Sequence, residues 1–232
     1  MTTLVIGDNA LAGDLVLAFD HGGHLYERTG PGDIRRIGAD GVTAVVDVTE
    51  PVEDWTPAVR RAARAAGVPL LRAIPPSFAE LAASTRWTWV ESFAAAKEVI
   101  AAAPGEVVLS IRPAVLASRL GDSERDTVLP HGSYAAPPGS WDDMRDTTLG
   151  PLVDRALSVL RRHSAPTLVA TDSGDLGTRA CLEAADRTST PVVIVRRPPM
   201  TEPPELTLSP IVGDVIAVAR WIHALHQKPS EA

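Results

Sequence analysis

The hydrophobic and polar positions of the chain repeat one pattern, in which a short apolar run leads through a polar turn into an amphipathic stretch. The pattern is clearest over residues 167–199. An apolar run at 168–170 ends in the polar loop 171–175, a helix is expected from about residue 177, and a second apolar run covers 192–195. Strands that alternate with helices predict parallel pairing through right-handed crossovers.

The first half of the chain follows the same order. Residues 42–46 are apolar, 47–51 form a polar turn, 57–66 have helical spacing, and 70–74 are apolar again. Further strands are expected at 4–6, 25–28, 87–90, 107–110 and 127–129. Further helices are expected at 11–19, 33–38, 93–102, 115–119, 152–162 and 212–225. The order predicts an α/β fold of two Rossmann-like lobes, with mostly parallel sheets and a cleft between them.

Proline and glycine at positions 104 and 105 favour a domain boundary there. We therefore expect an N-terminal dinucleotide-binding lobe over residues 1–103. Residues 104–232 would form a substrate lobe that includes the terminal helix.

Composition narrows the function classes. The 232 residues are 45% hydrophobic, enough for a full core, and the net charge of −7 argues against nucleic acid as a partner. No apolar run is long enough to span a membrane and no signal peptide is evident, so we expect a cytoplasmic protein without a membrane partner. The single cysteine, Cys181, excludes an internal disulfide, and the histidine spacings favour no metal site.

The first polar turn is a candidate cofactor loop. It follows the first strand and precedes a helix, where free backbone N–H groups attract anions. Its candidate cofactor-binding residues are Gly7, Asp8, Asn9 and Ala10. The G-x-G-x-x-G pattern is not met, so a polar turn capped by Asn9 is the alternative.

The end of the second strand is where a Rossmann lobe chooses between NAD and NADP. Glu27 suits a ribose hydroxyl, whereas Arg28 or Thr29 suits a 2′-phosphate. Because side chains alternate along a strand, only one of Glu27 and Arg28 points into the site. We favour NADP through Arg28, with ordinary surface charge as the alternative.

The turn after the 42–46 strand is the candidate catalytic position. Asp47 is expected to cap the backbone turn, while Thr49 and Glu50 face the cleft. Glu50 is a candidate proton donor. The alternative for Glu50 is a helix-start charge favoured by the helix dipole.

The matching loop of the second lobe is the candidate substrate site. Ser173 and Gly174 suit a carboxylate or phosphate, whereas Asp172 and Asp175 oppose strong anion binding. Further candidates for substrate contact are Thr171, Arg179 and, across the cleft, Arg112.

Taken in order, these segments resemble the precorrin-6A reductase family of cobalamin biosynthesis. The resemblance is clearest in VVDVTEP (45–51) with GVPLLR (67–72), and in VATDSGDLGTRACLEAA (169–185) with PVVIVRRPP (191–199). HGSY (131–134) resembles the family's Arg-Gly-Pro-aromatic turn and adds Tyr134 to the substrate candidates. The family's two Rossmann-like lobes use NADPH to reduce a double bond of a corrinoid macrocycle. The resemblance therefore implies an NADPH-dependent reductase, with NADH not excluded.

Departures from the family's motifs fall on polar positions. Glu50 stands where the family has a histidine, Asp172 where it has a lysine-asparagine pair, and Asp175 where it has a second glycine. We expect this negative charge to weaken binding of a polycarboxylate. The alternative function is a repurposed member of the fold that acts on another small molecule or binds a ligand without redox chemistry. A monomer or a homodimer is expected.

Overall fold

The chain divides into two compact units. Unit 1 is Met1–Pro75 with Met200–Ala232, and unit 2 is Pro76–Pro199. The computed structural model describes residues 2–7, 10–22, 26–29, 33–49, 56–103, 105–111, 149–198, 211–212 and 215–227.

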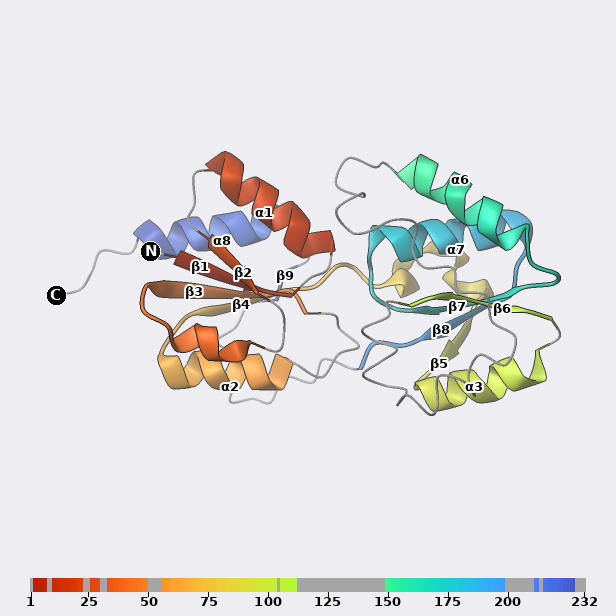
Figure 1. Ribbon diagram of the computed structural model, residues 1–232, viewed down its shortest axis with the longest axis horizontal. Helices are drawn as coiled ribbons and strands as arrows, with labels where there is room; N and C mark the ends of the chain where they lie inside the picture. Colours follow the sequence, from red (N-terminus) through yellow and green to blue (C-terminus); the bar gives the residue numbers. More distant parts are fainter. Residues whose placement is uncertain are drawn as a thin grey trace. The chain divides into compact units, whose positions relative to one another are not determined.

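Unit 1 is built on a parallel sheet of five strands (Figure 1). The strands are β1 (Thr2–Ile6), β2 (Tyr26–Thr29), β3 (Val42–Asp47), β4 (Leu70–Ala73) and β9 (Ile211–Val212), in the order β2-β1-β3-β4-β9. β1, β3 and β4 are almost wholly buried apolar runs, as expected of parallel strands covered on both faces.

Helices cover both faces of this sheet. Figure 1 shows α1 (Ala10–Gly22) and α8 (Val215–Gln227) on one face and α2 (Thr56–Ala66) on the other. Phe19 of α1 and Ile222 of α8 share a buried cluster with β1 and β3. Val59 of α2 packs on the opposite face with Ile37 of the short helix η1 (Ile34–Gly38).

Unit 2 has a parallel sheet of four strands with its own core. The strands are β5 (Thr88–Val90), β6 (Val107–Ser110), β7 (Thr167–Thr171) and β8 (Val192–Val195), in the order β5-β8-β7-β6. Figure 1 shows α6 (Leu149–Leu160) and α7 (Leu176–Thr188) on one face and α3 (Phe93–Ala102) on the other. Two short 3₁₀ helices, η2 (Phe78–Glu80) and η3 (Ala82–Arg86), precede β5.

The α/β class with two parallel sheets is confirmed, but the domain boundary is placed differently. The division expected between residues 103 and 104 lies inside unit 2, between α3 and β6. The terminal helix belongs to unit 1, because β9 pairs with β4 (Arg72 with Ile211, Ala73 with Val212) and α8 packs into the unit 1 core. A strand of two residues carries no periodicity, so the pattern gave no sign of this return.

Some expected features lie outside the described residues, namely the strand at 127–129, the helix at 115–119 and the turn at 131–134. Among the helices that the structure describes, none is long and apolar enough to cross a membrane. The cleft expected between the lobes stays a prediction.

Candidate functional site

The carboxyl ends of β1 and β3 form the switch point of the unit 1 sheet. β1 lies between β2 and β3, so the chain leaves β1 toward one side and later returns on the other. In open α/β sheets, ligands bind at this point. Backbone hydrogen bonds join the ends of the strands here. The Gly7 N–H, after β1, donates to the Thr29 carbonyl of β2 at 3.0 Å, and the Val48 N–H, after β3, donates to the Ile6 carbonyl of β1 at 2.9 Å.

Gly7 is required here by packing. Its φ of +133° disfavours other residues, and a Cβ would lie 2.8 Å from the carbonyl carbon and oxygen of Val48. A valine at this position would therefore destabilise unit 1 itself. Gly7→Val would therefore not separate a loss of nucleotide binding from a loss of folding.

The start of α1 is the candidate anion site. α1 begins at Ala10 and carries no acidic residue in its first turn. Its N-terminus follows β1 at the switch point, where the helix dipole favours negative charge. Asp8 and Asn9 lie outside the described residues.

The turn after β3 is held by a buried ion pair. Asp47, at the end of β3, is paired with Arg72, its register neighbour on β4, and the two side chains are 0% and 4% exposed. Arg72 Nη1 also donates to Thr49 Oγ1 at 3.0 Å, and Arg72 Nη2 donates to the Thr49 carbonyl at 3.3 Å. Asp47 Oδ1 accepts from the Thr49 N–H at 3.0 Å and from its hydroxyl at 2.7 Å. The expected capping of this turn by Asp47 is confirmed.

These contacts define what Thr49 can do. Its hydroxyl donates to Asp47 and accepts from Arg72, and the residue is 2% exposed. The hydroxyl is therefore committed within the turn, and Thr49 fits a positioning role better than proton transfer. Glu50 lies outside the described residues.

The end of β2 carries an ion pair that the sequence did not indicate. Glu27 accepts from Arg36 of η1, at 2.9 Å to Nε and 2.5 Å to Nη2. This hydrogen bond, with the charge of Glu27, raises the pKa of the Arg36 guanidinium. Tyr26 makes a tilted ring contact with Phe19 of α1, whereas Glu27 faces η1, so these two successive residues of β2 point to opposite faces of the sheet. The side chain of Arg28 is not among those described.

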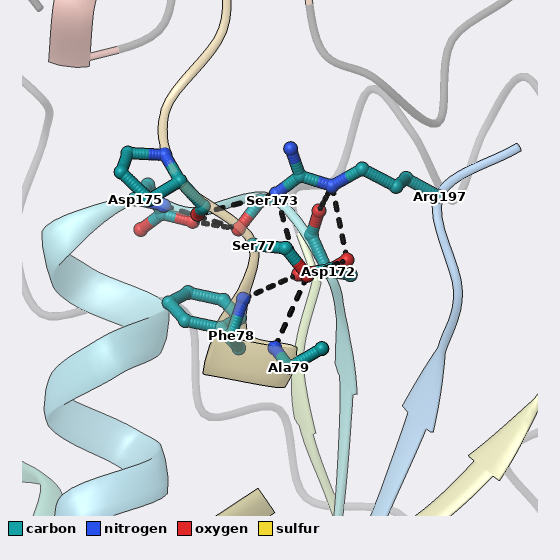
Figure 2. Close-up of polar contacts among 8 residues, drawn as sticks. Ser77, Phe78, Ala79, Asp172, Ser173, Asp175 and Arg197 are labelled. Carbon is teal, nitrogen blue, oxygen red and sulfur yellow. Dashed lines mark hydrogen bonds and ion pairs between the residues drawn. The ribbon is translucent and has the colours of Figure 1, made fainter. Parts of the chain in front are cut away.

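The Ser173 loop of unit 2 is tied to the start of α7 (Figure 2). Asp175 is the N-cap of α7, and its Oδ1 accepts from the Thr178 N–H at 2.8 Å. Ser173 Oγ donates to the other oxygen of the same carboxylate. Gly174 takes a φ of +76°, which lets the loop turn between these two residues.

Figure 2 shows Asp172 among its partners Ser77, Phe78 and Arg197. Its carboxylate accepts from Ser77 Oγ at 2.7 Å and from the Phe78 N–H at 2.8 Å. Arg197 Nε donates to Asp172 Oδ2 at 2.9 Å and to the Asp172 carbonyl at 3.0 Å. The Asp172 side chain is only 4% exposed.

The negative charge expected on this loop is therefore internal. Asp172 is neutralised by Arg197, and Asp175 is satisfied by a helix start and a hydroxyl, so neither presents an open carboxylate to a ligand. Thr171 is buried at the end of β7, whereas Arg179 is exposed on α7. Arg112 and Tyr134 lie outside the described residues.

The lone cysteine has no reactive character. Burial raises the pKa of the Cys181 thiol to about 11, although a hydrogen bond with Ser110 opposes the shift. Cys181 therefore serves as a small buried core residue. Within the described part of the chain, no group of three or more His, Cys, Asp or Glu side chains is placed to hold a metal ion.

Four polar residues were missed from the sequence: Arg36, Arg72, Ser77 and Arg197. Only Arg72 could have been recognised from the sequence. It lies in the otherwise apolar strand LLRA, and an arginine in a buried strand needs a buried partner. The partners of the other three depend on tertiary structure.

Comparisons with known proteins support the fold. No protein-family model and no curated protein matches the chain. A solved structure of CobK precorrin-6A reductase matches with a TM-score of 0.68 at 21% identity and covers 100% of both chains. Two other solved structures resemble the chain far less. A sugar transporter from Clostridium phytofermentans matches with a TM-score of 0.36 at 11% identity, over 97% of this chain and 93% of that one. Arylmalonate decarboxylase matches with a TM-score of 0.30 at 18% identity, over 84% of this chain and 87% of that one. The chain therefore has the fold of a precorrin-6A reductase.

Proposed function

We propose that the protein is an NADPH-dependent reductase that resembles precorrin-6A reductase and reduces a C=C or C=N bond of a corrinoid precursor or a related biosynthetic intermediate. The observation that carries the proposal is the switch point of unit 1, where Gly7 packs closely against Val48 after β3 and α1 has no acidic residue in its first turn. The likeness of the whole chain to a precorrin-6A reductase supports the same assignment.

The residues at the switch point fit a dinucleotide. Residues Gly7 to Ala10 would hold the pyrophosphate, Arg28 and Thr29 would hold the 2′-phosphate and ribose, and NADH would be the weaker ligand. The bound cofactor would supply a hydride. The Asp47–Arg72 pair would fix the Thr49 turn beside it, and Glu50 or water would supply the proton.

The Ser173 loop is the proposed substrate edge of unit 2, with Thr171, Gly174, Arg179, Arg112 and Tyr134 as further contacts. A repurposed function was suggested by the aspartates of this loop. Because Asp172 and Asp175 are engaged internally, that argument now rests only on Glu50 and on Asp8, whose carboxylate would repel a pyrophosphate. A polycarboxylate substrate is therefore more compatible with the loop than its sequence indicates.

A charge placed at the start of α1 tests the cofactor site. Ala10→Asp adds a carboxylate in the first helical turn, where the dipole favours it and the fold should persist. Near a pyrophosphate about 4 Å away, it would cost about 1 kcal/mol in water and about 4 kcal/mol near a protein surface. We expect the Kd for NADPH, measured by fluorescence titration, to rise by about fivefold to several hundredfold.

Two control variants make the result specific. Ala10→Asn has almost the same shape without the charge, so it should retain most of the affinity. Ala94→Asp places the same charge in the first turn of α3, at an exposed position in unit 2, and should change nothing. Equal affinity for Ala10→Asp and Ala10→Asn would refute this placement of the cofactor, and no NADPH binding by the wild type would refute the reductase assignment.

A further inference from the structure

The chain passes between the two units twice, and each passage carries a pair of prolines. The units divide after Pro75 and after Pro199, so the passages contain Pro75-Pro76 and Pro198-Pro199. Proline fixes φ and restricts the residue before it, so both passages have fewer accessible conformations than ordinary linkers.

One carboxylate holds both passages on the unit 2 side (Figure 2). Ser77 and Phe78, near the start of unit 2, donate to Asp172 at 2.7 and 2.8 Å. Arg197, near the end of unit 2, donates to the same carboxylate at 2.9 and 3.3 Å. Arg197 Nη2 also reaches the Pro76 carbonyl at 3.3 Å, which joins the two passages directly.

Burial strengthens this cluster of Asp172, Ser77 and Arg197, which we call the clasp. The side chains of Asp172 and Arg197 are 4% and 14% exposed. A charge-assisted pair with this little exposure is screened weakly by water and salt, unlike a surface ion pair. Breaking one partner leaves the other uncompensated, so the clasp has a strong preference for remaining closed.

The clasp also adjoins the Ser173 loop. Asp172 directly precedes Ser173, whose hydroxyl is bonded to the N-cap of α7. The two passages and the Ser173 loop therefore share one anchoring residue at the carboxyl end of β7.

We infer that Asp172 is a positioning residue that restricts the bending of both connections between the units. The clasp fixes residues 76–78 and 197 to unit 2, which shortens the part of each connection that can bend. This role is independent of the cofactor and the substrate, and it concerns the protein in its unliganded state.

Distances between spin labels test the inference. The one native cysteine, Cys181, is buried, so labels are placed at introduced cysteines. Ala65→Cys in α2 and Lys97→Cys in α3, both exposed, report on the two units together. Lys97→Cys with Arg155→Cys in α6 reports on unit 2 alone.

Asp172→Asn removes the charge that binds both passages. Arg197→Ala releases the second passage and the Pro76 carbonyl, but it keeps the bonds of Ser77 and Phe78 to Asp172. Both variants should broaden the distribution of label-to-label distances between the units by at least about half its width. Asp172→Asn should broaden it more than Arg197→Ala. The distribution of distances between the two labels within unit 2 should keep its width. The control is Val192→Ala, which opens a small cavity in the unit 2 core away from the clasp.

The control separates positioning from general destabilisation. If Val192→Ala lowers Tm and leaves the distances unchanged, the broadening belongs to the clasp. Unchanged distributions between the units in both clasp variants would overturn the inference. Equal broadening by Val192→Ala would overturn it as well.

Discussion

Removing the charge of Arg72 should be among the most damaging single changes in unit 1. Arg72→Met keeps much of the side-chain volume but leaves Asp47, which is 0% exposed, without its counter-ion. It also removes both guanidinium contacts to Thr49. The turn after β3 would lose its anchor on β4, while the apolar core around it would stay filled.

The expected loss of unfolding free energy follows from the burial of the Asp47–Arg72 ion pair. Breaking a buried ion pair by removing one partner costs about 3–5 kcal/mol, because an uncompensated charge remains inside. Changing Asp47→Asn as well removes that charge and keeps an oxygen for the Thr49 N–H. We therefore expect Asp47→Asn with Arg72→Met to be less destabilised than Arg72→Met alone, by about 1–3 kcal/mol.

Hydrogen exchange of the β3 and β4 amides is the appropriate assay, since it reports on unit 1 without assuming that both units unfold together. Arg64→Met, at an exposed position on α2, is the matched control and should change stability by no more than about 0.5 kcal/mol. A loss below about 1 kcal/mol for Arg72→Met would refute the reasoning, as would a double variant that is worse than the single one.

Three further predictions concern the pH dependence of stability, the loop at Gly105 and the choice between NADPH and NADH. The hydrogen bond from the Ser164 N–H lowers the pKa of the Glu106 carboxyl. Glu106 therefore contributes its full stability above its unfolded-state pKa of about 4.3, and the contribution is lost as pH falls through the folded-state pKa. Glu106→Gln should accordingly reduce the loss of unfolding free energy on the acid side of a pH titration. Gly105→Ala, at φ +99° and against backbone carbonyls, should lower the free energy of unfolding by about 1–3 kcal/mol in urea titration. Glu27→Gln should free Arg36 for a 2′-phosphate and raise the NADPH-to-NADH affinity ratio severalfold, and an unchanged ratio would place the 2′-phosphate elsewhere.

The sequence predicted the fold well because most elements have a clear period. Apolar runs such as 107–110 and 192–195 coincide with β6 and β8, since strands buried on both faces are continuous hydrophobic runs. The return of the chain to unit 1 through β9 left no such sign. The domain boundary was therefore misplaced, although each neighbouring element was recognised.

The candidate site was harder to predict, because a residue's position does not reveal where its charge is directed. Asp172 and Asp175 occupy the loop where ligands are expected, yet both serve the protein's own backbone and hydroxyl groups. Their partners Ser77 and Arg197 lie 95 and 25 residues from Asp172 along the chain, beyond any local pattern. Asp47 was the exception, because its capping contact lies only two residues away.

Turnover of precorrin-6A with NADPH tests the central claim most directly. The account predicts that the wild-type protein consumes NADPH only when precorrin-6A is present, and that the product is heavier than the substrate by two hydrogen atoms. It also predicts that Ala10→Asp slows the reaction far more than Ala10→Asn at limiting NADPH. A protein that binds neither NADPH nor NADH, or that leaves precorrin-6A unreduced in the presence of both, would contradict the account.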